Sequence, residues 1–194
     1  MPFAKLDRDA IVEEAVALLR REGLAAVSLR AIAARLGVSV SSLYWHVKDK
    51  ETLHALMSAS IFRACLDAVP QATSWPQWLH DFGLVLWEAQ TSIADARQLI
   101  AITRAREGIG EDALKRILAT LQPLGLPEAE AVIAQRAVQA LVTGWTALRS
   151  VRPAAAAADR ESFVRALDVL IAGWRAELAR QGEAADTPKS PASE

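Results

Sequence analysis

From Gly23 to Val47 the chain contains neither aspartate nor glutamate, although it carries 23 acidic residues in total. Cationic side chains lie inside this acid-free window or just after it, at Arg30, Arg35, Lys48 and Lys50. Hydroxyl groups accompany them at Ser39, Ser41, Ser42 and Tyr44. Nucleic-acid phosphates bind cations, hydroxyls and backbone N–H groups, and they repel carboxylates. The window therefore predicts contact with a DNA backbone.

Other side chains of the same window have the chemistry to read base edges in a DNA groove. An arginine can form two hydrogen bonds to one guanine, and a valine can contact the methyl group of thymine. The candidates for base contact are Arg30, Val40, Ser41, Trp45 and His46. The alternative is a helical hairpin whose basic edge is only solvated, and spacing and charge alone leave both interpretations open.

The elements that must hold these side chains are predicted to be two short helices joined by a tight turn. Ser28 is the expected N-cap of a helix over residues 29–36, and Gly37 ends it. Ser39 then caps a short third helix, and the small Ala33 faces the joint between the two. Apolar residues bury both helices against a first one, at Leu29, Ile32, Leu36, Val38, Leu43 and Val47. This anatomy is typical of a helix-turn-helix, whose second helix is free to enter a major groove.

The rest of the chain is also predicted to be helical, because it lacks sustained β-branched alternation and Asn-Gly or Asp-Gly turns. A first helix begins after Asp7 or Asp9, and a fourth runs from Asp49 to Pro70. Longer helices are expected over residues 75–92, 94–106, 111–122, 127–150 and 160–181. We expect an all-α fold with an N-terminal three-helix DNA-binding domain (1–50), a larger helical domain for ligand binding and dimerisation (51–181) and a flexible tail (182–194).

Residues 29–53, LRAIAARLGVSVSSLYWHVKDKETL, resemble the DNA-binding domain of the TetR family of bacterial repressors. The family's Gly-Val-Ser turn, Leu-Tyr-x-His-Val segment and Lys-x-x-Leu start appear at residues 37–39, 43–47 and 50–53. The form Leu-Tyr-Trp-His-Val-Lys is similar to the branch that includes the tetracycline repressors. The resemblance implies that Tyr44 and Lys50 hold phosphates and that Arg30 reads a base. Those repressors carry Gln-Pro-Thr where this chain has Val-Ser-Ser at 40–42, so the resemblance also implies a different operator.

A homodimer on a palindromic operator is expected, because one helix-turn-helix contacts too few base pairs for selective binding. The predicted interface lies on the helices around residues 128–149 and 162–181, where small residues permit close approach. Its members are Ala137, Ala140, Leu141, Gly144, Leu148, Leu167, Ile171, Trp174 and Leu178. The alternative is that this strip packs inside one subunit, and the family resemblance favours the dimer.

The larger domain also holds the candidates for binding a small molecule, since such pockets are mostly apolar with a few polar groups. The predicted effector contacts are Trp78, Phe82, Leu86, Ile100, Arg104, Gln139, Thr143 and Trp145. Plain core packing is the alternative for each residue singly, whereas the set together favours a small apolar or aromatic effector.

Tetracycline repressors hold the drug with a His and an Asn, and its magnesium with a second His. The corresponding positions in this chain are Leu66, Phe82 and Ile100. The resemblance therefore implies an effector other than tetracycline, with no metal and no other cofactor.

Composition restricts the function classes further. A formal net charge of −1 excludes a polycationic protein, and a single cysteine, Cys65, excludes an internal disulfide and a Cys-rich zinc module. We expect no membrane span and a cytoplasmic location, because no apolar stretch reaches the length that a span needs. Cys65 is either a redox-sensing thiol near Arg63 or a small buried hydrophobe.

The sequence contains no nucleophile–base constellation that indicates an enzyme. The expected function is sequence-specific transcriptional regulation, in which an effector releases a repressor from its operator. The helix over residues 49–70 joins the two domains and is the expected lever. The alternative function is an all-α dimeric ligand-binding protein without DNA-binding activity.

Overall fold

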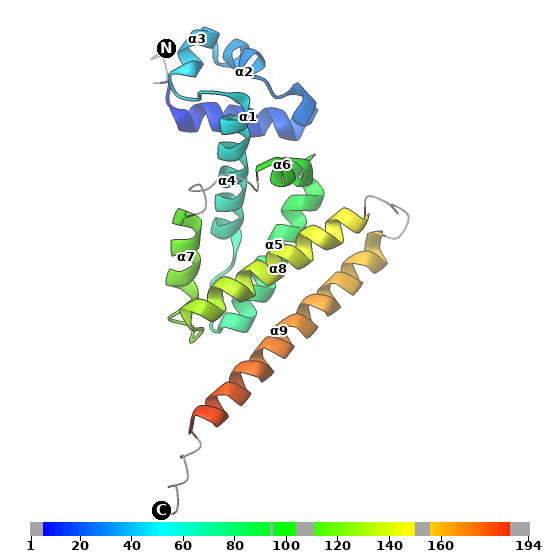
Figure 1. Ribbon diagram of the computed structural model, residues 1–194. Helices are drawn as coiled ribbons and strands as arrows, with labels where there is room; N and C mark the ends of the chain where they lie inside the picture. The colour runs from blue at the N-terminus through cyan, green and yellow to red at the C-terminus, as the bar shows by residue number, and fades with distance from the viewer. Residues whose placement is uncertain (1–5, 94, 104–110, 150–155, 187–194) are drawn as a thin grey trace, which may run out of the picture.

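The computed structural model describes residues 6–93, 95–103, 111–149 and 156–186. Within these ranges every regular element is a helix, so the all-α prediction is confirmed. None of the helices described there combines the length and hydropathy that a membrane crossing requires. Figure 1 shows a small N-terminal helical domain, a connecting helix and a larger helical body from which the last helix projects.

The N-terminal domain consists of α1 (Arg8–Glu22), the 3₁₀ turn η1 (Leu24–Ala26), α2 (Leu29–Leu36) and α3 (Val40–Tyr44). Side-chain caps determine where the α-helices start, because a cap oxygen accepts an N–H that the first turn leaves unpaired. Asp7 Oδ1 accepts from the Ala10 N–H at 2.9 Å, so Asp7 rather than Asp9 caps α1. The caps predicted at Ser28, Ser39 and Asp49 are confirmed.

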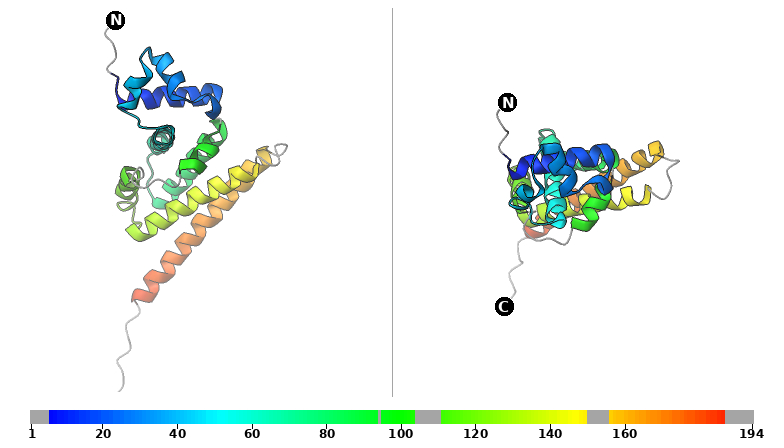
Figure 2. Two further views of the ribbon diagram at one scale, coloured as in Figure 1. Left: turned by 45° about the horizontal axis from the view of Figure 1, so that its top comes forward. Right: turned by 90° about the horizontal axis from the view of Figure 1, so that it is seen from above.

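The connecting helix is α4 (Lys50–Ala68), which runs from the N-terminal domain into the larger one (Figure 1). The larger domain contains α5 (Trp75–Ser92), α6 (Ala96–Thr103), α7 (Glu111–Leu121), α8 (Glu128–Arg149) and α9 (Ala156–Asp186). Figure 2 shows α8 and α9 side by side, with the C-terminal part of α9 extending past the rest of the fold. The two domains therefore share α4, and α9 offers a long face to solvent.

Both ends of α9 differ from the sequence expectation. The helix α9 was expected over residues 160–181, but it begins at Ala156 and continues past Gly182 to Asp186. Alanine has the highest helix propensity, so part of the alanine run extends the helix at its start, and Glu183, Ala184 and Ala185 extend it at its end. The flexible tail predicted from residue 182 is wrong for residues 182–186, and residues 187–194 lie outside the described ranges. The helix predicted over 94–106 is described only as Ala96–Thr103.

A glycine allows α5 to lie close to α8 and α9 in the core of the larger domain. A Cβ atom built on Gly83 would lie 2.7 Å from Leu167 Cδ2 of α9 and 3.2 Å from Val138 Cγ1 of α8. Aromatic rings fill the space on both sides of this contact. Phe82 stacks on Trp78 with centroids 5.0 Å apart, and Trp87 stacks on Phe163 at 4.3 Å.

We predict that Gly83→Val lowers the free energy of unfolding by about 1–3 kcal/mol, because the added methyl groups overpack the α5–α8–α9 contact. Urea denaturation measures the change. Gly182→Val is the matched control, since a Cβ at Gly182 of α9 meets no atom within 4 Å. Equal stability of the Gly83 and Gly182 variants would contradict this account of the packing.

Candidate DNA-binding surface and effector cavity

The helix α3 is held by residues that face inward from it and from the turn that follows. Leu43 and Val47 are both fully buried, and Ile32 and Ala33 of α2 are buried beside them. The sequence placed Leu43 and Val47 on one helix, but α3 ends at Tyr44, so Trp45, His46 and Val47 lie beyond its last residue. The Val47 N–H still bonds to the Leu43 carbonyl at 2.8 Å, which keeps both side chains on the inner side.

The turn between α2 and α3 depends on the backbone conformation of Gly37. Its φ of 66° and ψ of 30° lie in the left-handed region, and its N–H bonds to the Ala33 carbonyl to end α2. A Cβ at this position would meet nothing within 4 Å. Glycine is therefore required by the φ angle and not by crowding.

The outward side of this domain carries every residue predicted to contact DNA. Tyr44 is 53% exposed and Trp45 is 90% exposed, although both are large aromatic side chains. The other exposed members are Arg30, Ser39, Ser41, Lys48 and Lys50, and the half-buried members are Val40, Ser42 and His46. The structure places this set on α2, on α3 and on the segment that leads into α4, at one end of the molecule (Figure 1).

Three serine hydroxyls form a small cluster at the start of α3. Ser39 Oγ accepts from the Ser42 N–H at 3.2 Å, as an N-cap does. The same oxygen lies 2.8 Å from Ser41 Oγ and 2.7 Å from Ser42 Oγ. Ser39 therefore has a structural role as the N-cap. Of the two serines within α3, Ser41 is exposed and Ser42 is half-buried.

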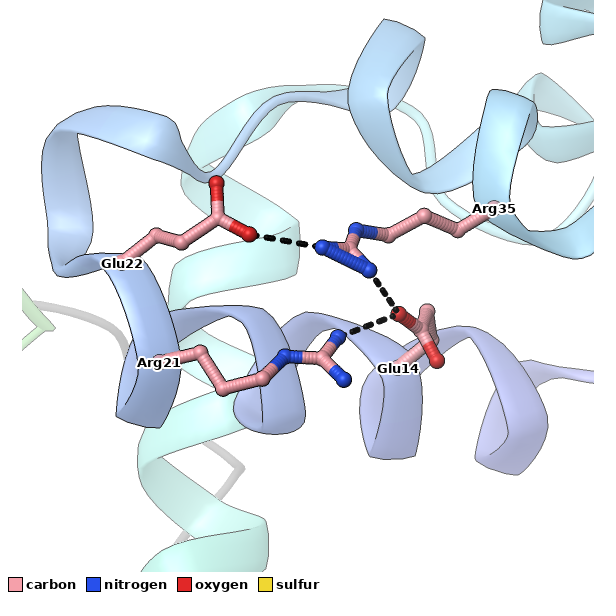
Figure 3. Close-up of polar contacts among 4 residues, drawn as sticks. All are labelled: Glu14, Arg21, Glu22 and Arg35. Carbon is pink, nitrogen blue, oxygen red and sulfur yellow. Dashed lines mark hydrogen bonds and ion pairs between the residues drawn. The ribbon is translucent and has the colours of Figure 1, made fainter.

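Arg35 lies within the acid-free window of the sequence, but in the structure its side chain contacts two glutamates that precede the window. Its Nη2 lies 2.6 Å from Glu22 Oε1, and its Nη1 lies 3.6 Å from Glu14 Oε1 (Figure 3). Glu14 Oε1 also lies 3.2 Å from Arg21 Nη2. These contacts join α2 to α1, so Arg35 orients the helix-turn-helix on its support. Sequence reasoning missed this role because both glutamates precede the window.

A cavity of about 460 Å³ lies in the larger domain among α4, α5, α6, α7 and α8. Three of the predicted effector contacts line it, namely Leu86, Ile100 and Gln139. Lining residues that the sequence did not single out as effector contacts include Ser58, Phe62, Cys65, Leu99, Ile117 and Gln135. They come from helices far apart in the sequence, so only the fold brings them together.

The remaining predicted effector contacts lie elsewhere. Trp78 and Phe82 are buried in their own stack, and Trp145 donates its Nε1–H to Asp159 Oδ1 at 2.9 Å. Thr143 does not line the cavity but bonds to two residues that do: Gln90 Nε2 donates to Thr143 Oγ1 at 3.2 Å, and Thr143 Oγ1 donates to the Gln139 carbonyl at 2.8 Å. Arg104 lies outside the described residues. Core packing, the alternative for these aromatic residues, is what the structure shows for Trp78, Phe82 and Trp145.

Cys65 lines the cavity and is 5% exposed. Burial raises the pKa of its thiol to about 11, although the positive charge of Arg20 opposes the shift. A thiol with this pKa is protonated at neutral pH and reacts slowly, which favours the buried-hydrophobe interpretation over a redox sensor. In the part of the chain that the structure describes, no cluster of His, Cys, Asp and Glu is arranged to hold a metal ion.

The predicted dimer face divides into a buried part and an exposed part. Leu167 is fully buried and Ile171 is 8% exposed within the protomer, so they belong to its core and add little to a partner surface. Ala140, Gly144 and Leu148 are exposed, while Ala137, Leu141, Trp174 and Leu178 are half-buried. Ile133, which is also exposed, extends this face of α8, whereas the exposed Val169 lies on the side of α9 opposite Leu167 and Ile171.

Comparison with known proteins identifies the family. The family described as "Bacterial regulatory proteins, tetR family" matches residues 11–56, which include α2, α3 and the start of α4. The class G tetracycline repressor of Vibrio anguillarum is 30% identical over 147 residues, which cover 73% of this chain and 68% of that repressor. The chain belongs to the TetR family.

Other TetR-family proteins extend the similarity to the larger domain. An HTH-type transcriptional regulator of Saccharopolyspora erythraea is 32% identical over 149 residues, 75% of this chain and 62% of the relative. A TetR variant from Acinetobacter baumannii, solved with minocycline, has a TM-score of 0.67 at 28% identity and covers 88% of this chain and 97% of its own. The curated relatives named here are called regulators or repressors, not enzymes. This chain spans about half to two thirds of the length of the curated relatives it matches.

In this TetR-family fold the cavity and the helix-turn-helix are joined by two contacts. The first is α4, which lines the cavity with Ala55 and Ser58 and begins at Lys50, the last of the predicted DNA contacts. The second is Asp95, which precedes α6 and whose Oδ2 accepts from the Leu24 N–H of η1 at 2.8 Å. Asp95 adopts a φ of 55°, a conformation that aspartate tolerates better than most residues. Both contacts connect elements of the cavity wall to the N-terminal domain.

One buried polar group lies on the connecting helix itself. His54 of α4 is 8% exposed, and no described residue bonds to its Nε2. Burial lowers the pKa of His54, and the positive charge of Lys50 lowers it further. The imidazole is therefore neutral at pH 7, and α4 carries no buried charge at this position.

Arg35 holds α2 against α1, whereas Lys48 is a predicted phosphate contact, so the two cations are expected to respond differently to substitution. We predict that Lys48→Ala reduces the slope of log Kd against log salt concentration by about one, since one phosphate contact is lost. Arg35→Ala should leave that slope unchanged and lower the free energy of unfolding by less than about 1 kcal/mol, because its ion pairs are partly exposed. Fluorescence anisotropy with operator DNA and urea denaturation measure the two effects. A lower salt slope for Arg35→Ala would contradict its assignment to the α1–α2 contact.

Proposed function

We propose that the protein is a transcriptional repressor that binds a palindromic DNA operator as a homodimer and is released by a small molecule. The observation that carries this proposal is the exposed, acid-free surface on α2 and α3, in a chain of the TetR family. Leu43 of α3 is fully buried, whereas Tyr44 is 53% exposed and Trp45 is 90% exposed. Contact with DNA explains both aromatic side chains, and the protein would act in the cytoplasm, where a bacterial operator lies.

The proposed DNA contacts divide by chemistry. Tyr44, Lys48 and Lys50 hold phosphates together with the serine cluster at the start of α3, because these groups donate hydrogen bonds or carry positive charge. Arg30, Val40 and Ser41 read base edges, with Trp45 and His46 beside them. Residues 1–50 form the DNA-binding domain of this proposal, and residues 51–181 form the regulatory domain.

The proposed dimer interface uses the exposed faces of α8 and α9. Leu148 is 72% exposed and Val169 is 67% exposed in the single chain, which is unfavourable for apolar side chains unless a partner covers them. A Cβ atom built on Gly144 would meet nothing within 4 Å, and Ala140 is exposed, so this part of the small-residue strip faces open space in the single chain. This supports the dimer over the alternative in which the strip packs within one subunit.

The proposed effector occupies the cavity among α4 to α8 and shifts the population between two dimer arrangements. Such a shift requires that the effector binds one arrangement more tightly than the other. The cavity walls include α4, which leads to α3, and α6, which follows Asp95. Tetracycline is not the proposed effector, since Phe82 is buried in its stack and Ile100 offers no metal ligand.

We predict that the protein binds DNA from upstream of its own gene selectively, and that Arg30→Ala weakens this binding by about 1–3 kcal/mol through one lost base contact. Fluorescence anisotropy against scrambled DNA, at several salt concentrations, measures both quantities. Arg63→Ala is the matched control, because Arg63 is exposed on α4 away from α2 and α3.

Equally weak binding to upstream and scrambled DNA, with no selected sequence from a random DNA pool, would contradict the proposal. That result would favour the alternative function, an all-α dimeric protein that binds a ligand without binding DNA. Selective binding that Arg30→Ala leaves unchanged would instead contradict the role of Arg30 in base contact.

A further inference from the structure

The cavity wall is almost uncharged where it is buried. Among the described residues that line it, only Glu111 and Arg136 carry charges, and both are exposed to solvent. The buried part of the wall is formed by side chains such as Leu86, Leu99 and Ile117. A charged group bound there would lose its hydration without gaining a counter-ion, which is strongly unfavourable.

Besides the Ser58 hydroxyl and the Cys65 thiol, the uncharged polar side chains that the described residues contribute to the wall are three amides, at Gln90, Gln135 and Gln139. Gln90 Nε2 donates to Thr143 Oγ1 at 3.2 Å, and Gln90 Oε1 accepts from Thr146 Oγ1 at 2.8 Å. Gln90 therefore braces α5 against α8. Both atoms of its amide group therefore already have one partner on α8.

The other two amides, Gln135 and Gln139, bond to each other and, among the described residues, leave one acceptor and one donor without a partner. Gln135 Nε2 donates to Gln139 Oε1 at 2.9 Å, which aligns two glutamines one turn apart on α8. In the described part of the chain, no group bonds to Gln135 Oε1 or to Gln139 Nε2. Gln135 as a whole is only 6% exposed, so its side chain lies largely inside the protein. The glutamine pair thus presents one acceptor and one donor, side by side, in a cavity whose other lining side chains are mostly apolar.

We propose that the cavity binds an uncharged, largely apolar molecule with one group that both accepts and donates a hydrogen bond, such as a carboxamide. The ligand carbonyl would accept from Gln139 Nε2, and its N–H would donate to Gln135 Oε1. The cavity of about 460 Å³ is within the range of sites that enclose a drug-sized molecule. This inference rests on the proposed function, because it assigns the chemical class of the effector.

The test compares three probes that share one ring system: anthracene-2-carboxamide, anthracene-2-carboxylate and 2-(aminomethyl)anthracene in its ammonium form. Binding to the full-length protein at pH 7 is measured by titration calorimetry without DNA. We expect the carboxamide to bind at least about ten-fold more tightly than either charged probe, since neither charge has a counter-ion in the buried wall.

Substitutions at Gln139 test the assigned hydrogen bonds. Gln139→Leu should weaken carboxamide binding about five- to ten-fold and leave binding of unsubstituted anthracene unchanged. Gln139→Glu replaces the donor by a carboxylate and should shift the preference toward the ammonium probe. Gln77→Leu, on an exposed residue outside the cavity, is the control and should change none of these values. Thermal unfolding verifies that each variant is folded.

The outcomes separate this inference from the proposed function. Tighter binding of either charged probe, or no binding of the carboxamide by a protein that still binds its operator selectively, would overturn the assigned ligand chemistry and leave the regulator intact. A carboxamide preference that survives Gln139→Leu would overturn the role of the glutamine pair. Loss of operator selectivity, with the carboxamide preference retained, would contradict only the DNA-binding proposal.

Discussion

A helix as short as the 5 residues of α3 has too few internal hydrogen bonds to be stable by itself. Its shape and position depend on the burial of Leu43 and Val47 against α1 and α2. Because those apolar side chains face inward, Tyr44, Trp45 and Ser41 must face outward. The proposed DNA-binding surface is therefore formed by the side chains that point away from this hydrophobic core. The ion pairs of Arg35 with Glu14 and Glu22 hold α2 against α1.

The helix α4 likewise has two roles, because its buried residues belong to the cores of both domains. Leu53 and Met57 are fully buried, while Ser58, Phe62 and Cys65 line the cavity. A molecule that changes the position of α4 in the cavity changes the support of the helix-turn-helix as well. The hydrogen bond from the Leu24 N–H to Asp95 ties the first domain to α6, the other cavity wall. In the proposed regulation, the effector would act on the DNA-binding domain through a rearrangement of side chains that pack in both domains.

Local patterns predicted the helices and their caps, because capping and apolar periodicity depend on residues within one or two turns. Ser28, Ser39 and Asp49 were found in this way, and the family resemblance then assigned roles to Arg30, Tyr44 and Lys50. Features that depend on tertiary contact escaped prediction. Trp78 and Phe82 have the composition of a binding pocket but stack in the core, and Leu167 has the spacing of an interface but packs on Gly83. The spacing of apolar residues predicts which face of a helix is buried, but it does not predict whether the core, a ligand or a second subunit covers that face.

The central claim is that two copies of α3 enter successive major grooves of one operator, whose centres are about 10 base pairs apart. Dimethyl sulfate protection of the bound operator tests it most directly, because guanine N7 lies in the major groove and adenine N3 in the minor groove. The account predicts protected guanine N7 atoms in two symmetric half-sites about one helical turn apart, with protection lost at the guanines contacted by Arg30 in the Arg30→Ala variant. Protection of a single half-site, or of adenine N3 alone, would contradict it.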